Sequence, residues 1–167
     1  MTFNKLKIAL ASSALVALSM GSTGAQAATD TATATANILE VVTVTQNANL
    51  NFGTIVPDSG VGATSGTVAI SAAGTRTCAA NLVCSLATTA AGFDVTGSTG
   101  QTVDVSVPAS VTLNGGGSSM SATLSGSAAT IVLDGTDAFT VGGTLTVGVD
   151  QTSASYTGTF TVTVDYQ

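Results

Sequence analysis

Two cysteines are the most reactive side chains of the sequence, and they lie close together. Cys78 and Cys84 are its only cysteines. Their C-x5-C spacing differs from the C-x-x-C of redox motifs, and a zinc site would need more ligands in a chain that has no histidine. In an oxidising compartment an even pair this close predicts a disulfide, which would stabilise the fold by about 2 kcal/mol.

Carboxylates are the other candidates for chemistry. Asp134 and Asp137 form the closest pair, where a calcium or acid–base role competes with a turn closed by an Asx-type hydrogen bond. Asp94 and Asp104 flank the segment STG, so they could face each other across a hairpin; ordinary exposed strand positions are the alternative. The triple glycine at 115–117 lacks the lysine and helix of a phosphate loop, and we expect a flexible turn there.

The residue types that are missing argue against catalysis. Without histidine there is neither a Ser-His-Asp triad nor an imidazole base, and without tryptophan a sugar-stacking platform is disfavoured. The only lysines are Lys5 and Lys7, which excludes lysine chemistry in the rest of the chain. We therefore expect no enzyme and no cofactor or metal site, with a hydrolase built on scattered Asp residues as the weakest alternative.

The N-terminus resembles an export signal rather than part of a fold. Lys5 and Lys7 precede an apolar run over 8–20, and Ala25-Gln26-Ala27 is a small-x-small cleavage site. This order predicts a secretory signal peptide at 1–27, because the run is too short for a comfortable membrane span. A retained anchor is the alternative, and we expect no membrane insertion of the mature chain.

The chain that follows the signal is acidic and long enough for one domain. Of 167 residues, 140 remain after Ala27, which suffices for a single hydrophobic core. They carry nine acidic side chains and one basic one, Arg76. Such a surface repels phosphate backbones, so nucleic acid is excluded as a partner.

Short strands are the elements that must position all these residues. Val and Thr dominate and favour strands, while Gly supplies turns, and no helical period follows the signal. Pro57 and Pro108 fall at strand ends, where a missing N–H does no harm. The pattern predicts an all-β sandwich or barrel. Its expected strands cover 38–46, 50–56, 67–71, 92–97, 101–108, 129–135, 139–150 and 156–167, and residues 110–126 are expected to form two strands joined by the glycine turn.

The two ends of the mature chain alternate most regularly. In the last strand Phe160, Val162, Val164 and Tyr166 should face the core, and Thr159, Thr161, Thr163 and Asp165 the other side. Leu145, Val147 and Val149 should make a similar buried face. At the start, TATATANI alternates in the same way, but most of its apolar members are alanines. A strand that has so little to bury is unusual at a chain end, where order is hardest to keep.

These two ends resemble the pilin subunits of the chaperone–usher type, most closely their alternate branch. The landmarks are the Thr/Ala-rich opening TATATANI and the terminal YTGTFTVTVDYQ with its penultimate Tyr166. The order of LNFGTIVP, GTR and the terminal strand is also similar to an uncharacterised family of small secreted pilin-like proteins. The resemblance covers nearly the whole mature chain.

The resemblance implies an immunoglobulin-like, pilin-type β-sandwich that lacks its last strand. An N-terminal extension at 28–46 would include the first strand, and 47–167 would form the single sandwich domain. A periplasmic chaperone would first fill the gap, and an outer-membrane usher would assemble the subunits. The extension of the next subunit would then replace the chaperone by strand addition, which builds a head-to-tail fibre.

The same resemblance assigns roles to individual residues. The donor face would consist of Ala32, Ala34, Ala36 and Ile38. The groove-lining strand, which the chaperone recognises, would carry Phe160, Val162, Val164 and Tyr166, and Cys78–Cys84 would be a pinning disulfide. The function implied is a structural subunit of a surface fimbria on a Gram-negative bacterium, used for adhesion or biofilm.

Two alternatives remain open from the residues. TATATAN could be a flexible leader, because three alanines bury little apolar area and leave Ile38 and the residues after it to anchor an exchange. The protein would then be a stand-alone secreted β-sandwich, a structural or binding module without strand exchange.

Overall fold

Strands joined by turns and loops make up the regular structure of residues 26–167, the part of the chain that this computed structural model describes. The signal peptide expected at 1–27 lies outside the described residues except for its last two positions. Residues 26–36 contain no strand, and each of them is exposed. The described residues form no helix that could span a membrane.

Residues 37–167 form one compact unit and contain all twelve strands. The strands are β1 (Thr43–Ala48), β2 (Thr54–Val56), β3 (Gly66–Ile70), β4 (Arg76–Cys78), β5 (Val83–Ser85), β6 (Ala91–Thr96), β7 (Thr102–Ser106), β8 (Ser110–Leu113), β9 (Met120–Gly126), β10 (Thr130–Val132), β11 (Thr136–Val147) and β12 (Thr163–Tyr166). All of their pairings are antiparallel.

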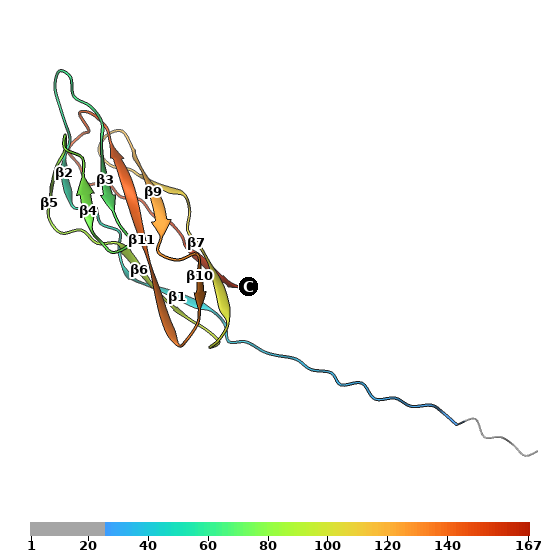
Figure 1. Ribbon diagram of the computed structural model, residues 1–167. Helices are drawn as coiled ribbons and strands as arrows, with labels where there is room; N and C mark the ends of the chain where they lie inside the picture. Colours follow the sequence, from blue (N-terminus) through green and yellow to red (C-terminus); the bar gives the residue numbers. More distant parts are fainter. Residues whose placement is uncertain (1–25) are drawn as a thin grey trace, which may run out of the picture. The chain divides into compact units, whose positions relative to one another are not determined.

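The long strand β11 organises the largest sheet (Figure 1). Its first half pairs with β6 and its second half with β3, while β9 pairs with residues 141–145. Strands β1, β4 and β8 lie outside β6, β3 and β9, which gives a seven-stranded sheet. The strands β10, β7 and β12 form a three-stranded sheet, and β2 and β5 form a two-stranded ribbon.

Two glycines mark the point where β11 changes partner from β6 to β3. A Cβ atom on Gly142 would collide with the carbonyl oxygen of Ile70, and one on Gly143 would lie 2.8 Å from the carbonyl oxygen of Thr123. Only residues without a side chain allow the neighbouring backbones to approach β11 this closely.

The core consists of two apolar clusters, one beneath each small sheet. The first joins β3, β8, β9 and β11 to the ribbon side, and its most deeply buried members include Val68, Leu145 and Val147. The second lies between the seven-stranded and the three-stranded sheet, around Val95, Val103 and Phe139. Leu50, Leu124 and Phe160 contact both clusters. The molecule is therefore an all-β sandwich in which the three-stranded sheet and the ribbon share the second layer.

Most expected strands are present with shifted ends. The strand expected at 38–46 starts later, at Thr43, and the one expected at 50–56 is reduced to β2. Both prolines follow the ends of strands, as predicted: Pro57 comes directly after β2, and Pro108 lies between β7 and β8. The strand expected at 156–167 is regular only from 163 to 166.

Two expectations about strand pairing and facing were wrong. The strands β6 and β7 form no hairpin, because β6 pairs with β1 and β11, whereas β7 pairs with β10 and β12. Val149 was expected on the buried face of Leu145 and Val147. It is exposed because β11 ends at Val147, so the alternation of faces stops there.

Candidate functional site

The first and the last strand of the sandwich both leave an edge without a partner in the described chain. Strand β1 is the outermost strand of the seven-stranded sheet, and β12 is the outermost strand of the three-stranded sheet. The amide of Gln167 donates to the carbonyl of Thr102 at 3.1 Å. Because bonding alternates along an antiparallel ladder, the backbone groups of Val164 and Tyr166 point away from β7, towards the unpartnered edge.

Hydrogen bonds around Tyr166, here called the clamp, join the segment before β1 to strand β12. The Tyr166 hydroxyl donates to the carbonyl of Glu40 at 2.8 Å and accepts from the amide of Ser98 at 2.7 Å. The amide of Glu40 in turn donates to the Ser98 hydroxyl at 2.7 Å. Both backbone groups of Glu40 are thus held, which fixes the point where the chain enters the sandwich.

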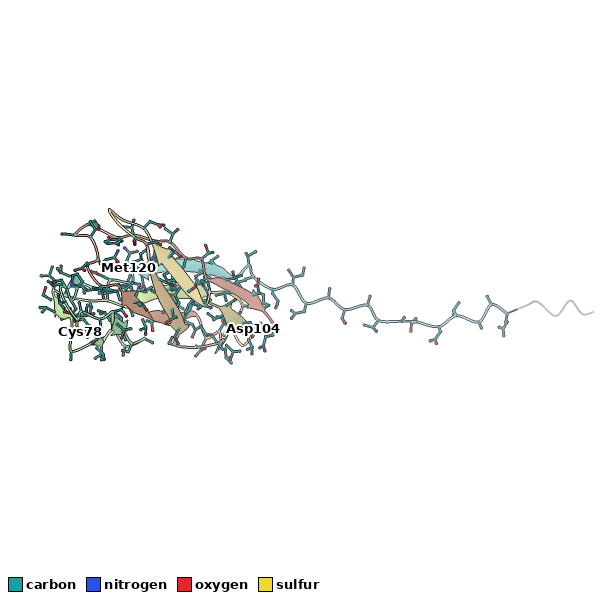
Figure 2. All side chains as sticks on the ribbon, turned by 90° about the horizontal axis from the view of Figure 1, so that it is seen from above. Cys78, Asp104 and Met120 are labelled. Atoms are coloured by element: carbon teal, nitrogen blue, oxygen red, sulfur yellow. A yellow bond between two sulfur atoms is a disulfide. The ribbon has the colours of Figure 1, made fainter. Side chains whose placement is uncertain are left out.

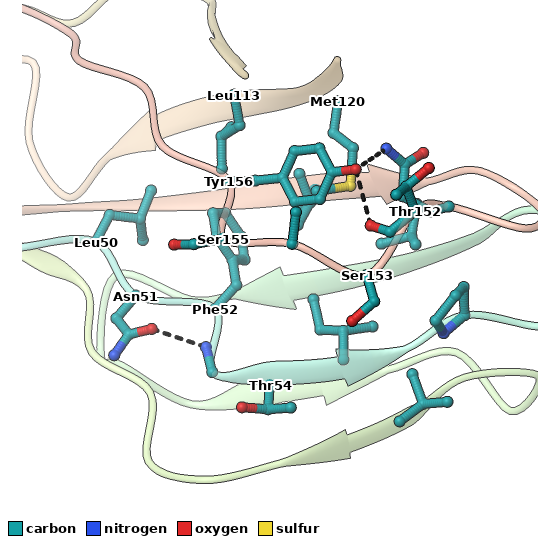
Figure 3. A pocket seen from close by; sticks show the side chains of 18 residues that line it. Leu50, Asn51, Phe52, Thr54, Leu113, Met120, Thr152, Ser153, Ser155 and Tyr156 are labelled. Carbon is teal, nitrogen blue, oxygen red and sulfur yellow. Dashed lines mark hydrogen bonds between the residues drawn. The ribbon is translucent and has the colours of Figure 1, made fainter. Parts of the chain in front are cut away.

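A groove of about 680 Å³ lies beside strand β2 of the ribbon (Figure 3). Residues 50–57 form one wall and residues 151–156 the other. Leu113, Met120, Leu145 and Val147 form the floor, and none of the lining residues is charged. The groove therefore lies between the segment that follows β1 and the loop that follows β11, and its lining is uncharged and partly apolar.

A free strand edge borders the groove on one side. Strand β2 pairs with β5 on one edge only, and β2 belongs to the groove wall. Beyond the other wall in the sequence, the backbone of residues 158–162 makes no hydrogen bond within the described part of the chain, but these residues do not line the groove.

The predicted disulfide is present and supports this wall. Cys78 and Cys84 are bonded, with their Cα atoms 6.3 Å apart. Cys78 belongs to β4 at the border of the seven-stranded sheet, and Cys84 belongs to β5 of the ribbon. The disulfide therefore links two sheets rather than the two arms of one hairpin.

Arg76 reinforces the same junction. Its Nη1 donates to the carbonyls of Ser85 at 2.9 Å and Leu86 at 2.8 Å, and Nη2 donates to that of Cys84 at 3.4 Å. The guanidinium of the GTR landmark thus saturates the carbonyls at the end of β5. Its hydrogen bonds give it a structural role, which the sequence did not predict.

The residues expected in the C-terminal strand alternate as predicted. Val164 is buried, Phe160, Val162 and Tyr166 are half-buried, and the residues between them are exposed. All four contact the second cluster, and the ring of Phe160 meets that of Phe93 edge-on, with centroids 6.4 Å apart.

The expected donor residues lie at the other end of the chain. Ala32, Ala34 and Ala36 are exposed in the strand-free segment, and Ile38 is 92% exposed.

The carboxylates do not converge on a site. Asp94 lies in β6 between Thr45 and Ala138, whereas Asp104 lies in β7 opposite Asp165, so the pair proposed for a hairpin is separated between two sheets. Figure 2 shows Asp104 and Cys78 towards opposite ends of the sandwich. The described residues contain no group of three side chains that could hold a metal ion.

The Asp134–Asp137 pair forms a turn, which was one of the two readings left open. The amide of Asp134, between β10 and β11, donates to Oδ2 of Asp137, in the first residues of β11, at 2.8 Å. The carboxylate accepts from an amide that precedes it, which is the reverse of the Asx-type bond expected.

Sequence reasoning missed the residues that shape the groove. No site role was predicted for Phe52, Met120, Gln151 or Tyr156. Phe52 and Met120 are buried in the first cluster. The sequence alone does not distinguish apolar residues that border an opening from those that are fully enclosed in the core.

Comparison with known proteins places the chain in a family without naming an activity. No curated protein and no solved structure matches it. Residues 42–166, which include every strand of the described residues, match a domain family. The chain belongs to the family described as Domain of unknown function (DUF4402).

Proposed function

We propose that this protein is a structural pilin subunit that polymerises by donor-strand exchange. The observation that carries the proposal is the open, uncharged groove between residues 50–57 and 151–156. A strand inserted there would find the free edge of β2, and strand addition of this kind gains affinity from the backbone and specificity from alternate side chains. The sandwich would be the incomplete, immunoglobulin-like fold of such subunits.

The occupant we propose is the N-terminal extension of a second copy. The segment TATATANI, residues 31–38, has eight residues without charge and alternates in side-chain size. The facing wall, residues 50–57, also spans eight residues. Ala32, Ala34, Ala36 and Ile38 would point to the floor of the groove.

Such an exchange implies a particular assembly and particular partners. Each copy gives its extension to the next, so the contact is head-to-tail and builds a fibre. Before assembly the open edge would be an aggregation hazard, which a periplasmic chaperone would cover and an outer-membrane usher would relieve. The product would be a fimbria on the surface of a Gram-negative cell, without enzymatic activity.

Deletion of residues 28–38 tests this function. The mature chain and the deletion variant would be produced with the periplasmic chaperone, purified and viewed by electron microscopy. We expect fibres from the full mature chain and none from the shortened chain. A variant with Thr31, Thr33 and Thr35 changed to Ser keeps the extension and should still form fibres. Normal fibres from the deletion variant would refute the proposal.

The clamp at Glu40 favours a second candidate, a stand-alone secreted β-sandwich module. Tyr166 already ties the first and last segments together, and no side-chain polar atom buried in the described residues lacks a hydrogen-bond partner. A protein that stays monomeric and soluble without a chaperone, with or without residues 28–38, would support this candidate.

A further inference from the structure

Tyr156 occupies part of the space between the groove walls. Its half-buried ring packs against the first cluster, close to Met120 and Leu113 (Figure 3). Its hydroxyl donates to the carbonyl of Thr152 at 2.9 Å and accepts from Nε2 of Gln151 at 2.9 Å. The ring is therefore held in one orientation by its own loop.

The triple glycine provides the place for this ring. A Cβ atom on Gly115 would lie 2.5 Å from Cδ1 of Tyr156, and one on Gly117 would lie 3.0 Å from its hydroxyl oxygen. A Cβ on Gly116 would lie 2.9 Å from that of Ala154 in the facing loop. Residues without side chains are required at this turn because the loop that carries Tyr156 lies directly on it.

A further hydrogen bond joins the loop to the turn. Nε2 of Gln151, which bonds the Tyr156 hydroxyl, also donates to the carbonyl of Ser118. The ring is thus fixed from the glycine side, from the loop and from the floor. A side chain that enters the groove next to it meets a wall that does not retreat without breaking these contacts.

We propose that Tyr156 is a specificity-determining residue that makes the groove selective for a donor strand with small side chains. The inference rests on the proposed strand exchange and explains its least expected feature, the three alanines at 32, 34 and 36. With the ring in place, one of these alanines fits beside it, whereas a leucine at the same position overpacks the site.

Each copy would act as both donor and acceptor, so one chain can carry a complementary pair of substitutions. Ala32→Leu, Ala34→Leu and Ala36→Leu are introduced one at a time, alone and with Tyr156→Ala. The amount of polymer formed by the purified full mature chain is measured by size-exclusion chromatography. Thr33→Leu and Thr35→Leu enlarge the opposite face of the extension and are the matched controls.

The expected result is a specific rescue. At one alanine position or more, leucine alone should weaken assembly about tenfold, which corresponds to about 1.4 kcal/mol. Tyr156→Ala in the same chain should recover most of this loss, while the threonine controls gain nothing from it. Tyr156→Phe keeps the ring and should leave the leucine variants weak. Circular dichroism of each variant verifies that the sandwich is folded.

Different results would refute the inference and the function. If the wild-type chain assembles through residues 28–38, but all three leucine variants assemble equally well, Tyr156 does not select side-chain size. The same conclusion follows if the leucine variants assemble weakly but Tyr156→Ala rescues none of them. If Tyr156→Ala unfolds the sandwich, Tyr156→Val is used in its place, and the absence of rescue by Tyr156→Val refutes the inference. If the wild-type chain does not assemble, or assembles without residues 28–38, the proposed function itself fails.

Discussion

At the residue scale, the single arginine of the sequence supports a wall of the groove. Arg76 donates three hydrogen bonds to the carbonyls of Cys84, Ser85 and Leu86, and it is half-buried. Planar guanidinium groups can reach several acceptors at once, which an ammonium group on a flexible stem cannot match. Leu86 has a left-handed φ of 62°, so the chain turns sharply where the guanidinium binds it.

Arg76→Lys should destabilise the fold even though the charge is kept. The lysine cannot bond all three carbonyls together, and hydrogen bonds to charged groups contribute roughly 1.5–3 kcal/mol each. We expect the free energy of unfolding, measured in urea, to fall by about 1–3 kcal/mol. Thr77→Ser, at the exposed neighbouring position in β4, should change it by less than about 0.5 kcal/mol. Equal stability of the lysine variant and the wild type would contradict this role.

At the element scale, the ribbon of β2 and β5 depends on contacts other than a continuous sheet. It has only two strands, and isolated two-stranded ribbons are marginally stable in water. The disulfide ties it to β4, and the half-buried Ile55 and Cys84 pack on the first cluster. The wall of the proposed groove should therefore be the first element to loosen when the disulfide is removed.

Replacing both cysteines by alanine tests that dependence. The free energy of unfolding should fall by about 2 kcal/mol, as expected for a short closed loop. Hydrogen exchange should accelerate most at Thr54–Val56 and Val83–Ser85, and least in β11, because local openings start from the least supported element. Treatment of the wild type with a reductant should reproduce the pattern. Acceleration that is uniform over all strands would show that the disulfide does not support the ribbon in particular.

The alternating strands could be predicted from the sequence, but the meeting of the sheets could not. In β7 and β12 every second side chain is apolar, so their buried faces follow from the period of two. The division of β11 between β6 and β3 depends on the backbone approach at Gly142, which no periodicity reveals. The groove likewise depends on the free edge of β2, which pairs with β5 alone. The alternation of apolar and polar residues predicts which face of a strand is buried. Which strand edges stay unpaired depends on partners far apart in the sequence.

At the scale of the whole molecule, the charge is spread over the surface and avoids the groove. Seven of the acidic residues lie beyond Glu40, and no charged side chain lines the opening. Asp104 and Asp165 even face each other across β7 and β12. Copies of this chain therefore repel one another at a distance, while the proposed contact itself is uncharged.

This distribution predicts that salt accelerates the proposed assembly. Repulsion between like-charged copies slows their encounter, and the screening length falls from about 30 Å at 0.01 M salt to about 8 Å at 0.15 M. Light scattering after release of the chaperone should show a severalfold faster rise at the higher concentration. Urea titrations at both concentrations control for a change in folding stability. Slower assembly at higher salt would mean that attraction between charges, absent from the groove, drives the contact. Backbone pairing and apolar burial do not depend on ion screening. The polymer, once formed, should therefore dissociate at the same rate at both salt concentrations.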